Sequence, residues 1–173
     1  MNLKPNKLDI KERAVLGMLS ALMYASKVVM DFLPNIHLLG AFIVAMTVVF
    51  RAKALFSIYT FVFITGLLSG FSIWWIPYLY IWTVLWLFTM LLPKNMSPKI
   101  APIIYMIISA LHGFLYGTLY APTQALMFGL DFEATIAWII AGLSFDFIHG
   151  ISNFFCGVLI VPIIKVLNKS QKI

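Results

Sequence analysis

Long apolar blocks separated by short polar gaps are the main pattern of this chain. Most blocks are close to the roughly 20 apolar residues that a helix needs to cross the hydrocarbon core of a bilayer. The pattern therefore predicts an all-α membrane protein with six transmembrane helices. The expected spans are residues 14–33, 36–50, 54–73, 76–92, 100–119 and 145–164.

A long connection, residues 120–144, separates the fifth and sixth expected spans. It contains the apolar stretch 134–141, which is far too short to cross a bilayer. We expect this stretch to form a short interfacial or re-entrant helix that begins near Asp131. The helix is expected to end at Gly142, because glycine often follows the last turn of a helix. Ser144 would then be the N-cap of the sixth span.

Basic residues occupy only one set of gaps. Of the twelve Lys and Arg residues, eleven lie in the tail 1–13, after the second and fourth spans, or after the sixth. The opposite gaps contain none and carry Asp131 and Glu133. Because basic residues accumulate in cytoplasmic loops, both termini are predicted to face the cytoplasm. The eleven residues are Lys4, Lys7, Lys11, Arg13, Arg51, Lys53, Lys94, Lys99, Lys165, Lys169 and Lys172.

The composition agrees with a membrane location and excludes several other classes. The 173 residues are 62% hydrophobic and only 10% charged, whereas soluble domains carry about 25% charged residues. This hydrophobic composition excludes a soluble enzyme and a disordered tail. A disulfide-linked scaffold is excluded because the single cysteine, Cys156, has no internal partner. The net charge of +6 does not indicate nucleic-acid binding, because no continuous basic face is formed. A single transmembrane domain is expected over residues 1–173.

One charged pair lies inside the first expected span. Lys27 precedes Asp31 by four residues, and helical geometry places Ser20 and Tyr24 on the same face. Charges inside a membrane span are costly and usually face a partner or a cavity. Two interpretations stay open. The pair is either an ion pair near the outer interface, with the lysine reaching toward water, or part of the wall of a binding cavity.

The last expected span carries a second polar face, formed by Asp146, His149 and Asn153. Asp146 would lie in the first helical turn, where the helix dipole stabilises a negative charge. Capping does not explain His149 and Asn153, which lie one and two turns deeper. Because the first span exits and the sixth span enters on the outer side, the two polar faces are expected to converge there.

Polar and aromatic side chains also gather near the outer ends of other spans. A tyrosine hydroxyl in hydrocarbon needs a hydrogen-bond partner, so these side chains are candidates for the wall or cover of a ligand site. The candidates are Tyr116, Tyr120 and Gln124 at the end of the fifth span, and Trp74, Trp75 and Tyr78 between the third and fourth spans.

The sequence gives little indication of catalysis. His37, His112 and His149 lie on three different expected helices, without the paired spacing of metal ligands. Asp146 and His149 could act as an acid–base pair, but no nucleophile lies beside them, and no phosphate-binding loop is found. We therefore expect no enzyme activity, no metal and no cofactor.

Six spans, cytoplasmic termini, a short chain and no ATP-hydrolysing motif together resemble one known class. This class is the substrate-binding S component of an energy-coupling factor (ECF) vitamin transporter. Ala21 and Ala25 match the AxxxA pattern of the first helix of that family. The segment 145–154, with Asp146, His149 and Asn153, is similar to the last helix of several S components.

The resemblance implies a specific mode of action. An S component binds a micronutrient near the outer face of the bacterial plasma membrane, beneath extracellular lid loops, here residues 73–80 and 120–144. It then associates, within the membrane lipid, with a transmembrane T component, which Ala21 and Ala25 would contact. Two cytoplasmic ATPases complete the transporter and alone use ATP. The residues assigned to the ligand site are Lys27, Asp31, Trp74, Trp75, Tyr78, Tyr116, Tyr120, Gln124, Asp146, His149 and Asn153.

Both charges, amide and imidazole groups and many aromatic rings favour a large polar ligand with planar parts. Among vitamins, a corrinoid such as cobalamin is the leading expectation. The alternative from another class is a stand-alone secondary carrier or channel, in which Lys27, Asp31 and Asp146 form a proton or ion path. That alternative is disfavoured because the polar groups concentrate toward one face and the sequence has no evident inverted repeat.

Overall fold

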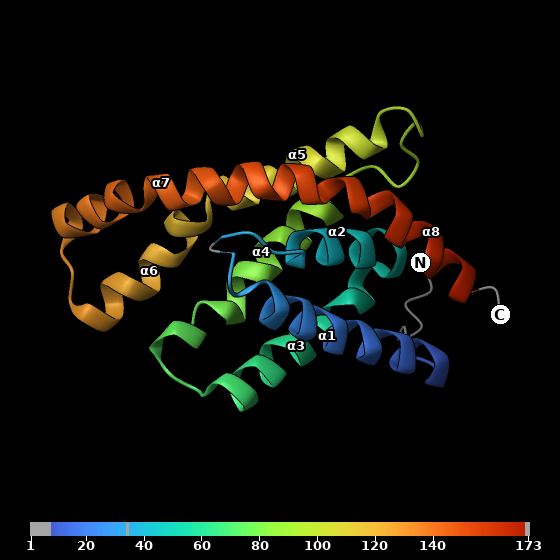
Figure 1. Cartoon of the computed structure of the whole chain (residues 1–173), viewed down its shortest axis with the longest axis horizontal. Coiled ribbons are helices and arrows are strands. Elements are labelled where there is room, and N and C mark those ends of the chain that lie inside the picture. The colour runs from blue at the N-terminus through green and yellow to red at the C-terminus, as the bar shows by residue number, and fades with distance from the viewer. Residues whose placement is uncertain (1–7, 34, 172–173) are drawn as a thin grey trace, which may run out of the picture.

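A computed structural model describes residues 8–33 and 35–171, and within these residues the chain is all-helical, with no strands. The helices form a bundle with a common long direction (Figure 1). The α-helices are α1 (Ile10–Met30), α2 (Leu39–Phe50), α3 (Ala54–Ser69), α4 (Tyr78–Met90), α5 (Ala101–Phe114), α6 (Tyr116–Phe128), α7 (Phe132–Cys156) and α8 (Ile160–Ser170). Short 3₁₀ helices are η1 (Arg51–Lys53), η2 (Ile73–Trp75) and η3 (Gly157–Leu159).

The helix α2 forms the centre of the bundle. Nine of its twelve residues are buried, and it packs against α4, α8, α1, α3, α5 and α7. A helix that is apolar on all sides is expected in such a position. Around it, α1 packs mainly on α3, and α5 packs mainly on α7. These contacts place the end of α1, the first turns of α4 and α6, and the middle of α7 around one region.

The described residues contain five helical stretches that are long and apolar enough to cross a membrane. The bounds of these stretches are Ile10–Met30, Leu39–Ser69, Ile73–Met90, Ala101–Phe128 and Phe132–Ser170. The stretch Leu39–Ser69 combines the second and third expected spans, but the chain reverses direction at η1 between α2 and α3 (Figure 1).

Arg51 forms the turn between α2 and α3. Its φ of 54° lies in the left-handed region, which costs a residue with a side chain about 1–2 kcal/mol. The turn is fixed from α4 by two hydrogen bonds. The Trp86 indole Nε1 donates to the Arg51 carbonyl over 3.1 Å, and the Arg51 guanidinium donates to the Met90 carbonyl over 2.9 Å.

The first helix begins earlier than expected. It starts at Ile10 instead of residue 14 because Asp9 and Glu12 form a capping box. The Asp9 carboxylate accepts from the Glu12 backbone N–H over 2.7 Å, and the Glu12 carboxylate accepts from the Asp9 backbone N–H over 3.1 Å. Two otherwise unpaired amides of the first turn are thereby satisfied. The tail 1–13 is therefore partly helical where it is described.

The expected division of residues 134–164 into a short interfacial helix and a separate sixth span is wrong. The helix begins after Asp131, as expected, with the Asp131 carboxylate accepting from Ala134 N–H over 2.8 Å. It then runs without interruption through Gly142 and Ser144. Glycine inside a helix costs about 0.5–1 kcal/mol relative to alanine, and continued backbone bonding with packing on α5 and α6 offsets that cost. Ser144 is therefore not an N-cap.

The expected loop 120–144 is a helical hairpin. The helix of the fifth expected span is interrupted only at Leu115 and continues as α6 to Phe128. Gly129, with a φ of 64° in the left-handed region, ends α6, as is common for a glycine after a helix. The tight turn then leads to Asp131, and α6 packs on the first half of α7.

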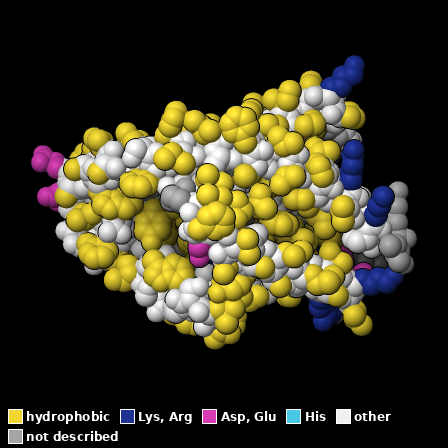
Figure 2. All heavy atoms as spheres, in the orientation of Figure 1, with side chains coloured by type: hydrophobic (Ala, Val, Ile, Leu, Met, Phe, Trp, Pro, Cys, Tyr) yellow, Lys and Arg dark blue, Asp and Glu magenta, His cyan; other side chains and the backbone are white. Residues whose placement is uncertain are grey.

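Most basic residues lie at one end of the molecule, and Asp131 and Glu133 lie at the other. Figure 2 shows the visible Lys and Arg side chains at one end, while the α6–α7 turn with Asp131 and Glu133 lies at the other end. The surface between them is mainly apolar. The start of α1 and the end of α8 lie together at the basic end (Figure 1). Lys4, Lys7 and Lys172, which the orientation argument also used, lie outside the described residues.

Candidate functional site

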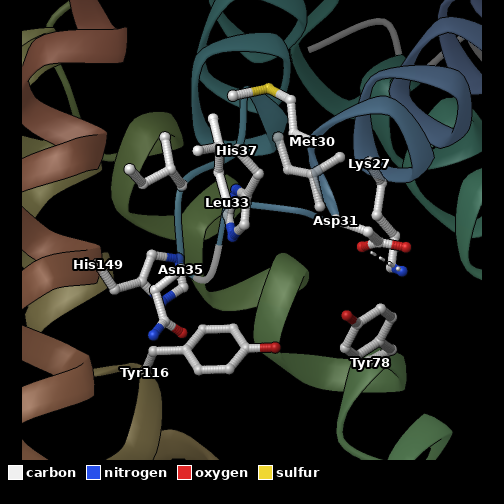
Figure 3. A pocket seen from close by; sticks show the side chains of 11 residues that line it. Lys27, Met30, Asp31, Leu33, Asn35, His37, Tyr78, Tyr116 and His149 are labelled. Atoms are coloured by element: carbon white, nitrogen blue, oxygen red, sulfur yellow. Dashed lines mark hydrogen bonds and ion pairs between the residues drawn. The ribbon is translucent and has the colours of Figure 1, made fainter.

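A cavity of about 240 Å³ lies at the end of α1 that points away from the basic end. The end of α1, the segment that follows it, and residues of α4, α6 and α7 surround this cavity (Figure 3). Its polar and aromatic lining residues are Lys27, Asp31, Asn35, His37, Tyr78, Tyr116 and His149. Segments far apart in sequence therefore converge on one small space.

Five residues assigned to the ligand site by sequence lie in this cavity. They are Lys27, Asp31, Tyr78, Tyr116 and His149. The Lys27 ammonium and the Asp31 carboxylate form an ion pair of 3.3 Å, and their side chains are 20% and 61% exposed. Both interpretations of this pair therefore apply together, because the ion pair is formed and it also lines the cavity.

His37 and Asn35 are polar cavity residues that the sequence analysis did not assign to the site. The His37 ring centroid lies 4.6 Å from that of His149, in an edge-on arrangement, and the Tyr116 ring lies 4.7 Å from His149 on centroids. The loop carrying His37 is tied to α7, because the Ser152 hydroxyl donates to the Asn35 carbonyl over 2.8 Å. Sequence spacing gave no signal, since His37 and His149 are remote from each other along the chain.

Trp82 and His112 support this wall from behind. Trp82 is only 1% exposed, and its ring contacts His37, Tyr116 and His112 at centroid distances of 6.0, 5.9 and 5.7 Å. His112 is fully buried, and its Nε2 lies 3.0 Å from the Ile81 carbonyl, to which it donates. The buried indole and imidazole therefore hold the rings of the cavity wall in place.

Two ring nitrogens at this wall are unpaired. His37 Nδ1 and His149 Nε2 are buried and have no hydrogen-bond partner among the described residues. A buried polar atom without a partner costs about 1–3 kcal/mol, and such atoms are uncommon in folded proteins. Both nitrogens are shielded from the cavity, so water or a polar ligand pairs with them only if the imidazole rings turn.

Asp146 does not line the cavity but joins two helices. Its Oδ1 accepts from the Gly117 backbone N–H over 2.9 Å. Gly117 belongs to the first turn of α6, so the carboxylate caps α6 from α7 and not its own helix. A side chain at residue 117 would place its Cβ 2.5 Å from Asp146 Oδ2, so the carboxylate would have to shift to make room for it.

Asn153 also lies outside the cavity lining. It is 1% exposed, and its amide nitrogen donates to the Ser109 carbonyl over 3.3 Å. Gly40 and Gly113 allow α2 and α5 to approach it closely. The polar face predicted for the last span is therefore divided among different surroundings, and of its three residues only His149 reaches the cavity.

One pair among the remaining predicted site residues connects the two segments assigned to the lid. The Tyr120 hydroxyl donates to the Trp74 carbonyl over 3.2 Å, and the Tyr120 ring stacks on Trp138 of α7 with 6.1 Å between centroids. Trp75 Nε1 donates to the Val62 carbonyl over 2.8 Å. Gln124 lies one turn further along α6. None of these four predicted residues is among those lining the cavity.

Ala21 and Ala25 lie on the exposed side of α1. The packed side of the same helix carries Leu16, Ser20 and Met23, and the Ser20 hydroxyl contacts the Ser57 carbonyl of α3 at 3.0 Å. The two alanines are therefore exposed on the surface of the bundle.

The arrangement is suited to binding a small polar molecule. Although His37, His112 and His149 come close to one another, no three His, Cys, Asp or Glu residues within 8–33 and 35–171 are placed to hold one metal ion. A comparison with protein-family models, curated proteins and solved structures finds no match to this chain. The geometry of the cavity and the sequence pattern therefore carry the functional argument.

Proposed function

We propose that this protein is the substrate-binding S component of an ECF-type importer in a bacterial plasma membrane. The proposed topology has six membrane spans, with α2 and α3 as separate spans and both termini in the cytoplasm. It binds its substrate without catalysing a reaction, and ATP is used only by partner ATPases.

One observation carries this proposal: α1 has two faces with different surroundings. Lys27 and Asp31 at its end line the cavity, while Ala21 and Ala25 are exposed on the outside of the bundle. An importer subunit needs both properties, because it must hold a substrate and dock against a membrane partner. Close approach of membrane helices favours small residues at the contact.

The position of the cavity supports binding from outside the cell. It lies away from the basic end of the bundle, and basic ends of membrane proteins usually face the cytoplasm. The contact between Tyr120 and Trp74 supports a cover made of η2 and the α6–α7 hairpin. The substrate would enter at this end and would be released after docking with the T component.

The size of the cavity changes the expected substrate. At about 240 Å³, it falls slightly below the range of about 300–1,000 Å³ typical of sites for drug-sized ligands. A corrinoid is far larger than such a ligand. The proposed substrate is therefore a smaller vitamin or related micronutrient, and cobalamin import stays a prediction that the volume disfavours.

The stand-alone carrier or channel has less support. That alternative needs Lys27, Asp31 and Asp146 to form one ion path. Asp146 is instead bonded to Gly117 N–H and does not line the cavity that contains the other two charges.

Purification of the tagged protein from its native membrane under mild detergent tests the proposal. Mass spectrometry should identify a T component and two ATPases, and reconstituted vesicles should take up substrate only with ATP. A parallel purification of the double variant Ala21→Leu/Ala25→Leu is the matched control. Uptake by the protein alone, driven by a proton or sodium gradient, would contradict the proposal and favour the carrier.

A further inference from the structure

We propose that the cavity binds a small heteroaromatic acid, with its ring against His37, His149 and Tyr116 and its acidic group at Lys27. This inference rests on the proposed function and names the chemical class of the substrate. Three observations carry it: the volume of the cavity, the unpaired nitrogens at one end, and the unequal exposure of the ion pair at the other.

The volume fits a ligand of one ring, or two fused rings, with a short substituent. A cavity of about 240 Å³ corresponds to about eight water molecules, at roughly 30 Å³ for each in the liquid. A ligand of this size has few rotatable bonds and is held mainly by its ring and one or two polar groups.

The end of the cavity that His37 and His149 line favours a flat ligand ring with polar atoms at its edge. Tyr116 and His37 lie on either side of His149, with ring centroids 4.7 and 4.6 Å from it, and Figure 3 shows these three side chains together at one end. His37 Nδ1 and His149 Nε2 have no partner within the described part of the chain. Both nitrogens are shielded from the cavity as the rings lie, so a ligand reaches them only when a ring turns about its Cβ–Cγ bond. A ligand ring nitrogen, or an adjacent carbonyl and N–H, then gives each neutral imidazole a partner. A purely hydrocarbon ring leaves these groups unpaired.

The ionic end selects an anion over a cation. Lys27 is the more buried partner, at 20% exposure, and its ammonium has one described bond, to Asp31 Oδ1. A ligand carboxylate at Lys27 supplies a second acceptor, and Asp31, which is 61% exposed, can turn to water at little cost. A cationic ligand at Asp31 would instead leave the more buried lysine without its counter-charge, which is costly. Figure 3 shows this pair at the side of the cavity opposite His149.

Three matched probes test this class on the purified full-length protein in detergent, by calorimetric titration. Nicotinate carries a ring nitrogen and a carboxylate, nicotinamide keeps the ring nitrogen without the charge, and benzoate keeps the charge without the ring nitrogen. Nicotinate is expected to bind at least about tenfold more tightly than either of the other two. A cation of similar size, 1-methylnicotinamide, is expected to bind most weakly.

Variants assign each preference to its residue. Lys27→Met should lower the affinity for nicotinate to that for nicotinamide and leave the affinity for nicotinamide unchanged. Lys27→Arg keeps the positive charge and should retain tight binding of nicotinate. His149→Phe should weaken the binding of nicotinate and of nicotinamide but not the binding of benzoate. Lys94→Met, an exposed substitution at the basic end, is the matched control and should change nothing. Gel filtration and thermal unfolding of each variant establish that it is folded.

Specific results overturn the inference. Equal binding of nicotinate and nicotinamide, or tighter binding of the cation, would show that Lys27 does not select an anion. Equal binding of nicotinate and benzoate would remove the role of the histidines. If no probe binds while the protein still co-purifies with a T component and ATPases, the substrate class is wrong and the proposed function stands. If the probes bind as expected but no such partners are found, the class stands and the proposed function fails.

Discussion

Asp146 shows how one buried carboxylate acquires its role from another helix. It lies in the middle of α7, where its own backbone is fully helical and offers it no free amide. The break at Leu115 leaves the first amides of α6 without intrahelical acceptors, and the carboxylate accepts one of them, Gly117 N–H. Asp146 therefore fixes the start of α6, which carries Tyr116 of the cavity wall.

Removal of this cap should lower stability. Asp146→Ala is expected to cost about 0.5–2 kcal/mol, the usual value for loss of a helix cap, while Asp146→Asn keeps an acceptor and should cost less. Thermal unfolding in detergent measures both variants. Ser144→Ala, an exposed change on the same helix, is the control. A variant Asp146→Ala with unchanged stability and abolished ligand binding would restore the direct ligand role expected from sequence.

The packing of Gly117 on Asp146 provides an independent check. Gly117→Ala adds a Cβ close to the Asp146 carboxylate, so it should destabilise the protein by about 1–3 kcal/mol through overpacking. The loss should be smaller in the Asp146→Ala background, because the shorter side chain makes room. The four proteins form a double-mutant cycle, and strict additivity of the two changes would show that this contact has no energetic importance.

Among the elements, α1 is joined to the turn between α2 and α3 by an ion pair. The Lys53 ammonium lies 2.6 and 2.7 Å from the two Glu12 carboxylate oxygens, and the two side chains are 17% and 18% exposed. Glu12 also completes the capping box of α1. This one carboxylate therefore fixes both the start of α1 and its position against η1.

Breaking this pair should separate α1 from the turn. Glu12→Gln keeps an acceptor for the Asp9 amide and removes the charge, so it tests the pair without removing the cap. Because the pair is intermediate between exposed and buried, the expected cost is about 1–3 kcal/mol. Chemical unfolding of Glu12→Gln, Lys53→Met and the double variant measures the coupling. Lys11→Met is the control, since Lys11 is exposed on α1, and a coupling near zero would contradict the prediction.

The exposed face of α1 is expected to contact the T component and to have no part in stability or ligand binding. Ala21→Leu with Ala25→Leu adds bulk where two helix backbones should approach, at a cost of about 1–3 kcal/mol to complex formation. Stability and ligand binding of the isolated protein should not change, because both residues are exposed. Pull-down of the T component measures the effect. Ala137→Leu, at an exposed alanine on α7, is the matched control, and normal ATP-driven uptake by the double variant would refute the docking assignment.

At the scale of the whole molecule, the separation of charge determines the expected orientation. The described basic gaps lie at one end of the bundle, and Asp131 and Glu133 lie at the other. A protein with this distribution should insert with the basic end in the cytoplasm, because moving several lysines across a bilayer is unfavourable. The cavity would then open on the outer side.

Cysteine labelling in intact cells checks this orientation. In a Cys156→Ser background, a cysteine replacing Glu133 should react with an impermeant reagent from outside. A cysteine replacing Lys94 or Lys165 should react only after the membrane is opened. Outside labelling at Lys94 would reverse or disprove the topology, and protection of the Glu133 position in intact cells would show that the α6–α7 turn is not extracellular.

The sequence by itself determined the helical class, the long apolar stretches and the separation of charge. These features depend on local composition and on a repeat of 3.6 residues, which do not require knowledge of neighbouring helices. The same locality explains why the Lys27–Asp31 pair and the start of a helix at Asp131 were predicted correctly. In each case the interacting groups lie within four residues of each other.

Only the tertiary structure decided that α7 continues past residue 142 and which polar residues meet. Gly142 and Ser144 resemble a helix end and a new cap, yet packing on α5 and α6 keeps the helix continuous, because a local stop signal costs less than the contacts that override it. His37 meets His149, and Asp146 meets Gly117, only because α2, α5, α6 and α7 pack together. Contacts between remote segments follow from the shape of the packed bundle, and helical periodicity within one segment contains no information about them.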